Sequence, residues 1–408
     1  MFVYRQDNLE ETVHDVVRNT AWSDFYYKKY HLSGQSESFD FLQLPYLLRD
    51  ELATTPLRER TYCEPRAIRF FGFSSGTTTG TPLISAFGEI SSYHVEPSLG
   101  MDIKRPLIVY PPLNKNFGAS FIQQCREARR PVSPVFGNIE QLANSAVLAG
   151  MTDCDSVYAT PTIALRLAPY LQQYYDTNKI QLLALASETV TPYIWRQLRT
   201  LYPQASISNL YASSEIGQFI LYTKPSRDVF PEHFIVMPHT VAALELIDDE
   251  LVVTYLTNPA FPLIRYKTGD SFKLSEQGEN GIPHLIMVGR EGVDTIKVGG
   301  FELRGRDIDE CVEGLPQSFR DYQLHVYEVN ESQYRVEFEY VSKTEGDKSM
   351  QAILIRSHLV NHFKLSGALS FEAAIVKGIL TDFTVSEVAA VSVQGQKRRV
   401  VVFHNNLA

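Results

Sequence analysis

The segment from Ser74 to Pro82 (SSGTTTGTP) brings small hydroxyl side chains and glycines together in one short turn. Backbone N–H groups in such a turn can form a nest for phosphate oxygens. Gly76 and Gly80 allow close approach of a ligand and positive φ angles, and further donors come from Ser74, Ser75, Thr77, Thr78 and Thr79. The segment is not a Walker A loop, because GxxxxGK[ST] requires a lysine that is absent here. A solvated turn is the ordinary alternative, but apolar strands are expected on both sides, and they would hold a phosphate loop rigid.

Two further polar segments each follow an apolar run that we expect to be a buried strand. Ser187 and Glu188 come after IQLLALA, and NLYASSE contains Tyr211, Ser214 and Glu215. In open α/β sheets, ligands bind beyond the carboxyl ends of the strands. Tyr211 could stack on a base, and Glu215 could hold Mg²⁺ bridging phosphates. The alternative is a core tyrosine and a solvated glutamate.

Two later segments offer a carboxylate and a hinge. RYKTGD places Asp270 at the expected end of a strand, where its carboxylate could accept bonds from two ribose hydroxyls, although a plain turn is the alternative. GREGVDTIKVGG contains Arg290 and three later glycines, which is a plausible hinge between domains.

The elements that must position these residues are predicted from periodicity. Strands and helices alternate from RAIRFFGF (66–73) to about residue 210, which argues for an α/β sheet covered by helices. Thr160 can cap a helix there, with Pro161 at its first position. Between residues 233 and 275 apolar residues recur at every second position, which predicts a β-rich subdomain. After residue 289 we expect strands at LHVYEV, YRVEFEYV, EAAIV and RRVVVF and a helix near 348–363, which make a small α+β domain.

We therefore predict an α/β N-terminal domain of several subdomains, residues 1–288, with helix-covered sheets and a β-rich subdomain, and a small C-terminal domain, residues 289–408. The chain has 408 residues, which suits about two or three domains. Its 44% hydrophobic and 21% charged residues are ordinary for a folded protein. A net charge of −9 argues against broad binding of nucleic acid or of an anionic membrane surface.

The sequence also predicts a cytoplasmic protein. The first residues lack the apolar core of a signal peptide, and no stretch approaches the ~18 apolar residues that span a bilayer. The four cysteines are scattered, with no Cys/His cluster at metal-ligand spacing, which fits a reducing compartment and offers no zinc site.

Together these segments resemble the adenylate-forming superfamily of acyl-CoA synthetases, peptide-synthetase adenylation domains and luciferases. SSGTTTGTP resembles its phosphate loop, YASSE its adenine and magnesium motif, YKTGD its ribose motif and GREGVDTIKVGG its hinge. The resemblance extends from about residue 40 to the C-terminus, because LPYLLRDEL and ATPTIALRLA resemble the phenylacetate–CoA ligase branch. The short chain is similar to compact members of that branch, such as aryl acid ligases of phenazine-antibiotic pathways.

The resemblance implies a role for each matching residue. Thr77, Thr78 and Thr79 would contact the pyrophosphate-leaving end of ATP, with Ser74, Ser75, Gly76 and Gly80 in the same loop. Ser187 and Glu188 would border the adenine, Tyr211 would pack on it beside Ser214, and Glu215 would hold Mg²⁺. Asp270 would bind the ribose hydroxyls with help from Arg290. The implied reaction is attack of a carboxylate on the α-phosphorus of ATP, which needs positioning and charge neutralisation rather than a general base.

Two departures from the family pattern bear on catalysis. The hinge motif has one extra residue, so either Gly292 or Asp294 could be the pivot. The C-terminal motif, a glycine followed by the adenylating lysine, reads Gly395-Gln396-Lys397, so Gln396 replaces the lysine in strict register. A shift of one residue would let Lys397 serve, whereas a solvated basic hairpin is the alternative. Loss of such a charge-stabilising donor typically lowers the rate by ~10²–10³.

The acid pocket would be lined from within residues 109–136 and near Ala186 and Gly217. Tyr110, Phe117, Phe121 and Phe136 are candidates, and these rings favour a flat or aryl acid, with core filling as the alternative. The sequence does not indicate whether the acceptor of the acyl group is CoA, a carrier-protein thiol or an amine. The resemblance to the compact branch also gives the expectation of a homodimer.

Two other functions stay open. In an acyl-protein synthetase a cysteine would take the acyl group, and Cys311 would be the candidate, although IDECVEG holds nothing that lowers a thiol pKa. Gln396 instead motivates a catalytically weak protein that binds a nucleotide or an acyl-AMP. Neither a nucleic-acid nor a membrane role has a supporting feature.

Overall fold

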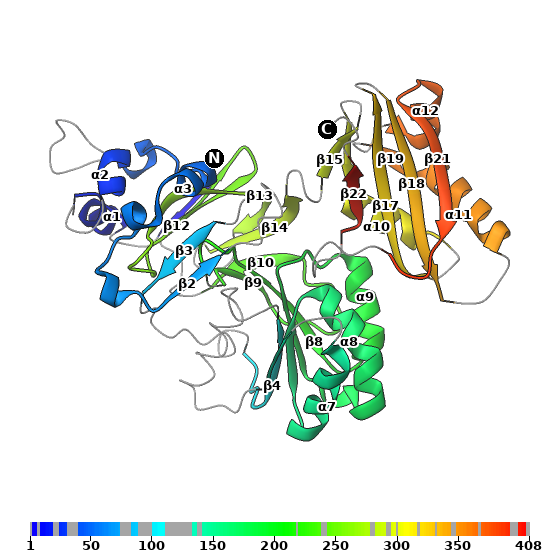
Figure 1. Ribbon diagram of the computed structural model, residues 1–408, viewed down its shortest axis with the longest axis horizontal. Helices are drawn as coiled ribbons and strands as arrows, with labels where there is room; N and C mark the ends of the chain where they lie inside the picture. Colours follow the sequence, from blue (N-terminus) through cyan, green and yellow to red (C-terminus); the bar gives the residue numbers. More distant parts are fainter. Residues whose placement is uncertain are drawn as a thin grey trace. The chain divides into compact units, whose positions relative to one another are not determined.

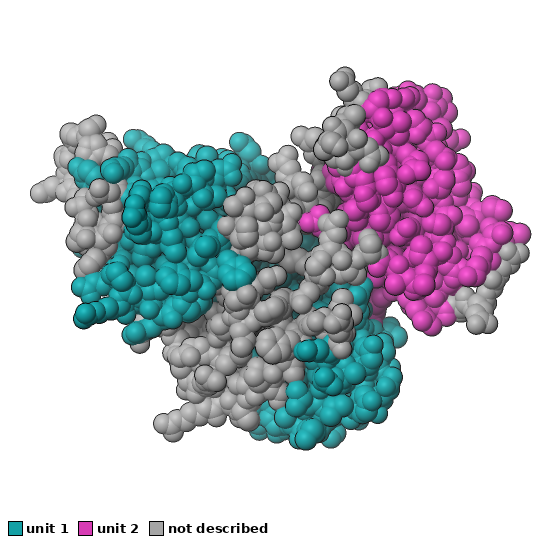
Figure 2. All heavy atoms as spheres, viewed as in Figure 1, with its two compact units in different colours: residues 1–189, 198–288 teal, residues 190–197, 289–408 magenta. Residues whose placement is uncertain are grey.

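The computed structural model describes most of the chain, in eighteen segments. They are residues 2–5, 9–18, 24–30, 40–73, 83–88, 100–110, 133–136, 141–217, 219–237, 243–277, 282–290, 295–298, 301–315, 319–330, 333–343, 348–365, 369–391 and 399–404. The chain forms two compact units: unit 1, Met1–Thr189 with Leu198–Val288, and unit 2, Val190–Gln197 with Gly289–Ala408 (Figure 2). Residues 190–197, which the sequence predicts in the first domain, group with unit 2.

Unit 1 is built on one mixed sheet of twelve strands (Figure 1). In spatial order these are β1 (Phe2–Arg5), β11 (Ala243–Ile247), β12 (Glu250–Tyr255), β13 (Leu263–Gln277), β14 (Pro283–Arg290), β10 (His233–Val236), β9 (Leu221–Thr223), β8 (Ser206–Tyr211), β7 (Leu182–Ala186), β6 (Ser156–Ala159), β4 (Pro106–Tyr110) and β5 (Ser133–Phe136). The predicted α/β fold class is confirmed. The region from 233 to 275 is rich in strands as predicted, but these strands belong to the same twelve-stranded sheet and form no separate compact unit.

The half of this sheet that carries the candidate site is parallel. Strands β5, β4, β6, β7 and β8 all run in one direction, and the chain passes between them through α7 (Leu142–Thr152), α8 (Pro161–Tyr174) and α9 (Pro192–Leu201). Helix α8 lies against β6 and β7 (Figure 1). It begins as predicted, with the Thr160 hydroxyl accepting from the Ile163 N–H at 3.2 Å and Pro161 in the first turn. Because the strands are parallel, their carboxyl ends meet at one edge.

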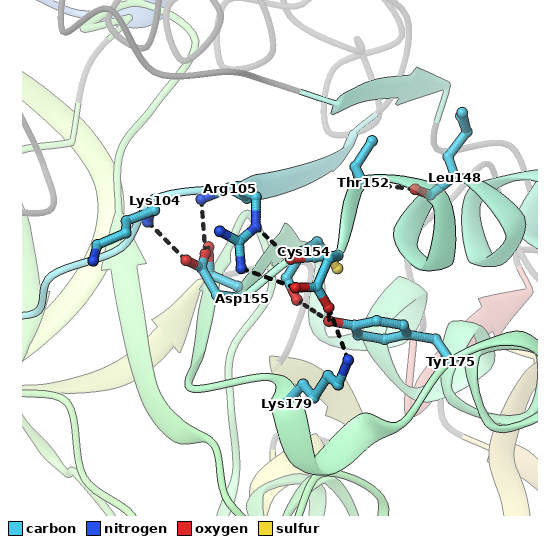
Figure 3. A network of polar contacts seen from close by, with 10 residues as sticks. Lys104, Arg105, Leu148, Thr152, Cys154, Asp155, Tyr175 and Lys179 are labelled. Carbon is cyan, nitrogen blue, oxygen red and sulfur yellow. Dashed lines mark hydrogen bonds and ion pairs between the residues drawn. The ribbon is translucent and has the colours of Figure 1, made fainter.

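The opposite edge, at the amino ends of these strands, is closed by polar side chains (Figure 3). The Asp155 carboxylate accepts from the backbone N–H groups of Lys104, at 2.8 Å, and Arg105, at 3.0 Å. Asp153 bonds to Lys179 and Arg105, and its pKa is lowered mainly by the hydrogen bond from Lys179. These contacts join the segments that precede β4, β6 and β7.

The remaining elements of unit 1 surround the sheet. Strands β2 (Phe70–Phe73) and β3 (Ile84–Phe87) pair as an antiparallel hairpin. The predicted strand 66–73 is therefore shorter than expected, since Pro65–Ala67 forms a 3-10 turn, η2. The other elements are α1 (Leu9–Arg18), α2 (Asp24–Tyr30), η1 (Phe41–Gln43), α3 (Arg49–Thr54), α4 (Leu57–Arg60) and η4 (Thr177–Lys179).

Unit 2 is a four-stranded sheet with helices packed on it. The sheet order is β21 (Leu380–Glu387), β18 (Gln333–Ser342), β17 (Phe319–Asn330) and β22 (Val401–His404), and α11 (Lys348–His362) and α12 (Phe371–Val376) lie against β21 (Figure 1). The other elements are β15 (Thr295–Val298), β16 (Phe301–Arg304), α10 (Gly305–Glu313), β19 (Lys364–Leu365) and β20 (Leu369–Ser370).

One strand prediction in unit 2 is wrong. EAAIV, residues 372–376, lies in helix α12, because the Ser370 hydroxyl caps it by accepting from the Ala373 N–H at 3.1 Å. The helix near 348–363 is confirmed as α11, and LHVYEV and YRVEFEYV lie in β17 and β18.

None of the described helices is long and apolar enough to cross a membrane.

Candidate functional site

Two predicted residues follow β7 at the carboxyl edge of the parallel strands. Ser187 adopts a left-handed backbone conformation, with φ 71°, an uncommon state that often marks ligand sites. The Glu188 carboxylate accepts from the Thr162 hydroxyl at 2.6 Å and from the Thr162 N–H at 3.1 Å. Glu188 thus accepts a backbone N–H in the first turn of α8, where a negative charge is favourable. Its place beside an adenine stays a prediction.

Tyr211 and Asp270 are directly bonded. The Tyr211 hydroxyl donates to Asp270 Oδ2 at 2.6 Å, and both residues are buried. The Tyr211 ring also packs edge-on against Phe272, with ring centroids 5.1 Å apart. The structure therefore brings together the residues predicted for adenine and ribose. Asp270 does not end a strand, contrary to the prediction, because β13 continues to Gln277 and only bends at Gly269, where φ is 73°.

Glu215 is held by an arginine that the sequence did not single out. Ser214 and Glu215 lie in a turn in which the Gly217 N–H bonds to the Ser213 carbonyl at 2.9 Å. The Glu215 side chain is only 5% exposed, so the solvated alternative is wrong. Arg49 Nη1 lies 2.6 Å from Glu215 Oε1, and the Arg49 side chain is 16% exposed.

Arg49 is placed by the segment Phe41–Leu48, which we call the strap. The Leu47 N–H donates to the Arg265 carbonyl and the Lys267 N–H donates to the Leu47 carbonyl, both at 3.0 Å, so the strap pairs with β13. The buried guanidinium of Arg265 bonds to both carboxylate oxygens of Glu245, at 2.9 and 2.6 Å, and to the carbonyls of Leu42 and Leu44. The strand that carries Asp270 therefore also anchors Arg49.

The segment that follows the predicted phosphate loop, from Leu83 to Phe87 at the end of β3, lies beside the Glu215 turn. The loop residues themselves, Ser74, Ser75, Gly76, Thr77, Thr78, Thr79 and Gly80, lie outside the described residues. Leu83, just after the loop, packs in one buried cluster with Tyr211 and Ile216. The Phe87 ring, at the end of β3, fills the space next to Gly217.

The predicted acid-pocket residues are only partly described. Ala186 is buried in an apolar cluster with Tyr158, Phe219 and Met237. Gly217 has φ 75°, and a Cβ placed on it would lie 2.1 Å from Phe87 Cε1, so only glycine suits this position. Phe117, Phe121 and the side chains of Tyr110 and Phe136 lie outside the described residues.

The predicted hinge and C-terminal motif cannot be placed. Arg290 is the last residue of β14, but its side chain lies outside the described residues, as do Gly292, Asp294, Gln396 and Lys397. Their roles stay predictions.

The structure gives no support to a cysteine acceptor. Cys311 is partly buried, and burial raises the pKa of its thiol to about 11. A protonated thiol is a weak nucleophile at neutral pH. Burial also raises the pKa of Cys154, to about 12.

A magnesium ion brought by a nucleotide would suit Glu215. Mg²⁺ is commonly bound through one or two carboxylates together with substrate phosphates. The described residues contain no cluster of three or more His, Cys, Asp or Glu side chains that could hold a metal ion by themselves. The buried Glu215 carboxylate lies near Leu83, just after the predicted phosphate loop, and its role as a magnesium ligand stays a prediction.

The chain has the fold of a solved CoA ligase, which is the fold that the resemblance to the adenylate-forming superfamily implies. The chain is similar to a solved 2-hydroxyisobutyryl-CoA ligase in the postadenylation state, with a TM-score of 0.72, 15% identity and coverage of 97% of this chain and 88% of that one. No family model matches the chain.

Two curated relatives are CoA ligases by name. The long chain fatty acid-CoA ligase VraA of Staphylococcus epidermidis is 23% identical over 299 residues, 67% of this chain. The phenylacetate-coenzyme A ligase of Pseudomonas putida is 25% identical over 188 residues, 42% of this chain. The chain covers 62% of the length of the first and 42% of the second, less than two thirds of either.

Proposed function

We propose that this chain is an ATP-dependent ligase that activates a small carboxylic acid as its acyl-AMP and releases pyrophosphate. The observation that carries the proposal is that two separate motifs, and the residue that follows a third, come together at the carboxyl ends of the parallel strands. Tyr211 bonds to Asp270, Glu215 lies four residues after Tyr211, and Leu83, after the predicted phosphate loop, packs against the same cluster.

In the proposed reaction, a carboxylate oxygen of the acid attacks the α-phosphorus of ATP. A new P–O bond forms, the bond between the α-phosphorus and the bridging oxygen breaks, and pyrophosphate carries away the electron pair. The attacking carboxylate is already ionised, so no residue has to remove a proton. Catalysis rests on positioning and on neutralising the charge that develops on the phosphates.

Each described residue has a part in that positioning. Asp270, oriented by the Tyr211 hydroxyl, would accept hydrogen bonds from the ribose hydroxyls. Tyr211 would offer one face to the adenine beside Ser187, at the end of β7. Glu215 would hold a divalent cation, which supplies charge neutralisation at the phosphates when it is bound. Thr77, Thr78 and Thr79 would contribute the phosphate loop.

We propose CoA as the acceptor, because the relatives and the similar structure are all CoA ligases by name. The thiolate sulfur would attack the acyl carbonyl, and AMP would leave with the electron pair. A carrier-protein thiol or an amine would react by the same route. The aromatic residues predicted around the acid favour an aryl acid, although the relatives' names span fatty, aryl and hydroxy acids.

Acid-dependent exchange of pyrophosphate into ATP tests the first half-reaction. Wild type is compared with Lys397→Ala and Gln396→Ala across a panel of aryl, fatty and hydroxy acids, and CoA is then replaced by amines. We expect exchange with at least one acid and a loss of ~10²–10³ in Lys397→Ala but not in Gln396→Ala. ATP binding without exchange for any acid would contradict the ligase and favour a nucleotide-binding protein, the alternative that Gln396 motivates.

A further inference from the structure

Glu215, the carboxylate proposed to receive a divalent cation, already has a cation beside it. Arg49 Nη1 lies 2.6 Å from Glu215 Oε1, which is the distance of a charge-assisted hydrogen bond. Both side chains are largely buried, at 16% and 5% exposed. An ion pair with so little water around it is stronger than one at the surface. A divalent cation that binds Glu215 therefore has to compete with Arg49 or share the carboxylate with it.

The backbone of Arg49 is fixed by contacts that do not involve the nucleotide. It is the first residue of α3, whose N-terminus is capped by the Glu51 carboxylate accepting from the Leu48 N–H at 2.8 Å. Glu51 is itself paired with Lys29. On the other side, the strap is held by Leu47 against β13 and by Arg265. The strap and helix can therefore stay in place while only the Arg49 side chain changes partner.

A buried carboxylate without a counter-charge is costly, typically more than a paired one gains. Without Arg49, Glu215 would face this cost whenever no divalent cation is bound. Because Arg49 Nη1 contacts Glu215 Oε1 directly, it supplies a counter-charge and orients the carboxylate in the nucleotide-free protein. The same contact lowers the affinity of Glu215 for any second cation, since two positive charges on one carboxylate repel each other.

We propose that Arg49 is a positioning residue that pairs with the Glu215 carboxylate when no divalent cation is bound. This ion pair breaks when the cation arrives with the nucleotide and binds the carboxylate instead. The proposal rests on the function proposed above. It makes cation binding at Glu215 conditional on the nucleotide, whose phosphates add the ligands needed to outweigh Arg49.

The test measures Mn²⁺, as a substitute for Mg²⁺, by the electron paramagnetic resonance signal of the bound ion. The full chain is saturated with α,β-methylene-ATP, which cannot be cleaved at the bond that the reaction breaks. Wild type is compared with Arg49→Gln, Arg49→Lys, Glu215→Gln and the double variant Arg49→Gln/Glu215→Gln. The same titrations are repeated with Mn²⁺ alone.

In Arg49→Gln the half-saturating Mn²⁺ concentration should fall about tenfold, equivalent to about 1.4 kcal/mol of lost competition. Arg49→Lys keeps the charge and should lie between wild type and Arg49→Gln, which also covers a failure of the glutamine variant to fold. The double variant should bind Mn²⁺ as weakly as Glu215→Gln. An unchanged or higher half-saturating concentration in Arg49→Gln, or the same gain in the Glu215→Gln background, would overturn the proposal.

Nucleotide binding, measured separately by calorimetry, distinguishes the two proposals. If wild type binds no nucleotide, the proposed function fails. Competition by Arg49 is then still supported if Arg49→Gln binds Mn²⁺ alone more tightly than wild type does, and it is refuted if the two bind Mn²⁺ alone equally. If wild type binds the nucleotide and catalyses exchange while the Arg49 variants bind Mn²⁺ as wild type does, only the competition is refuted.

Discussion

At the scale of single residues, the candidate site is made of buried polar side chains that satisfy one another. Tyr211 and Asp270 share a hydrogen bond of 2.6 Å, and Arg49 and Glu215 share an ion pair of the same length. Buried polar groups are costly unless they are bonded. Each of these pairs therefore holds a carboxylate in a defined place before any ligand binds.

Tyr211→Phe should weaken nucleotide binding as well as stability. The variant keeps the ring but removes the donor to Asp270, so the free energy of unfolding should fall by about 1–3 kcal/mol. Asp270 would lose its orientation towards the ribose, so ATP should bind more weakly in a calorimetric titration.

Tyr202→Phe is the matched control for this variant. The Tyr202 hydroxyl is also fully buried and donates to the Ala164 carbonyl at 2.8 Å, but it belongs to the helix packing. It should lose similar stability and keep the ATP affinity of wild type. Equal ATP affinities in Tyr211→Phe and wild type would remove Asp270 from the proposed site.

At the scale of elements, the sequence predicted helices and strands correctly where the pattern of apolar residues was clear. The buried run IQLLALA and the alternating run ELVVTYL contain β7 and β12, and a threonine–proline pair starts α8. The segment EAAIV was predicted as a strand but is helical, because a run of five residues is too short for its apolar pattern to distinguish a helix from a strand. The Ser370 hydroxyl caps the N-terminus of this helix, and a serine at that position was the sequence signal that could have predicted it.

The partners in the site could not be predicted because they come from distant parts of the chain. Arg49 is 166 residues from Glu215, and Tyr211 is 59 residues from Asp270. The sequence motifs identified Glu215, Tyr211 and Asp270 as candidates but not Arg49. No local pattern indicates that Glu188 caps α8 or that Phe87 packs on Gly217, because the strand order that causes these contacts is a property of the whole sheet.

A histidine cluster in the sheet of unit 2 should make that unit sensitive to acid. His404 on β22 and His325 on β17 are hydrogen-bonded at 2.9 Å, and His404 stacks on Tyr327 at 4.3 Å. Burial lowers the pKa of His404, as do its electrostatic interactions with His325 and Arg335, whereas Glu337 and Glu339 have the opposite effect. The folded protein therefore binds a proton at His404 less readily than the unfolded chain.

Stability from this cluster is present above the ordinary histidine pKa of about 6.5 and is lost as the pH falls below it. We expect the denaturation midpoint of unit 2 to decrease between about pH 7 and pH 5. In His404→Gln this decrease should be smaller. His362→Gln, at the exposed end of α11 in the same unit, should retain it. Equal acid sensitivity in wild type and His404→Gln would contradict the assignment.

At the scale of the whole molecule, the described residues form separate cores. One buried cluster, which includes Val326, Phe338 and Leu359, belongs to unit 2. The clusters around Tyr211 and around Ala186 belong to unit 1. A change inside one core should therefore act on the stability of its own unit.

Gly217→Ala tests this separation. A methyl group there meets the Phe87 ring and an unfavourable positive φ, so it should cost about 1–2 kcal/mol for the backbone and about 1–3 kcal/mol for overpacking. Gly100→Ala, in the same unit at φ 68° with nothing within 4 Å, should cost only the backbone part. Hydrogen exchange should accelerate in peptides from β7 and β8 and stay unchanged in peptides from β17 and β18. Acceleration in both sets would mean that the two cores unfold as one cooperative unit, because a local clash would then be felt by every residue that opens with it.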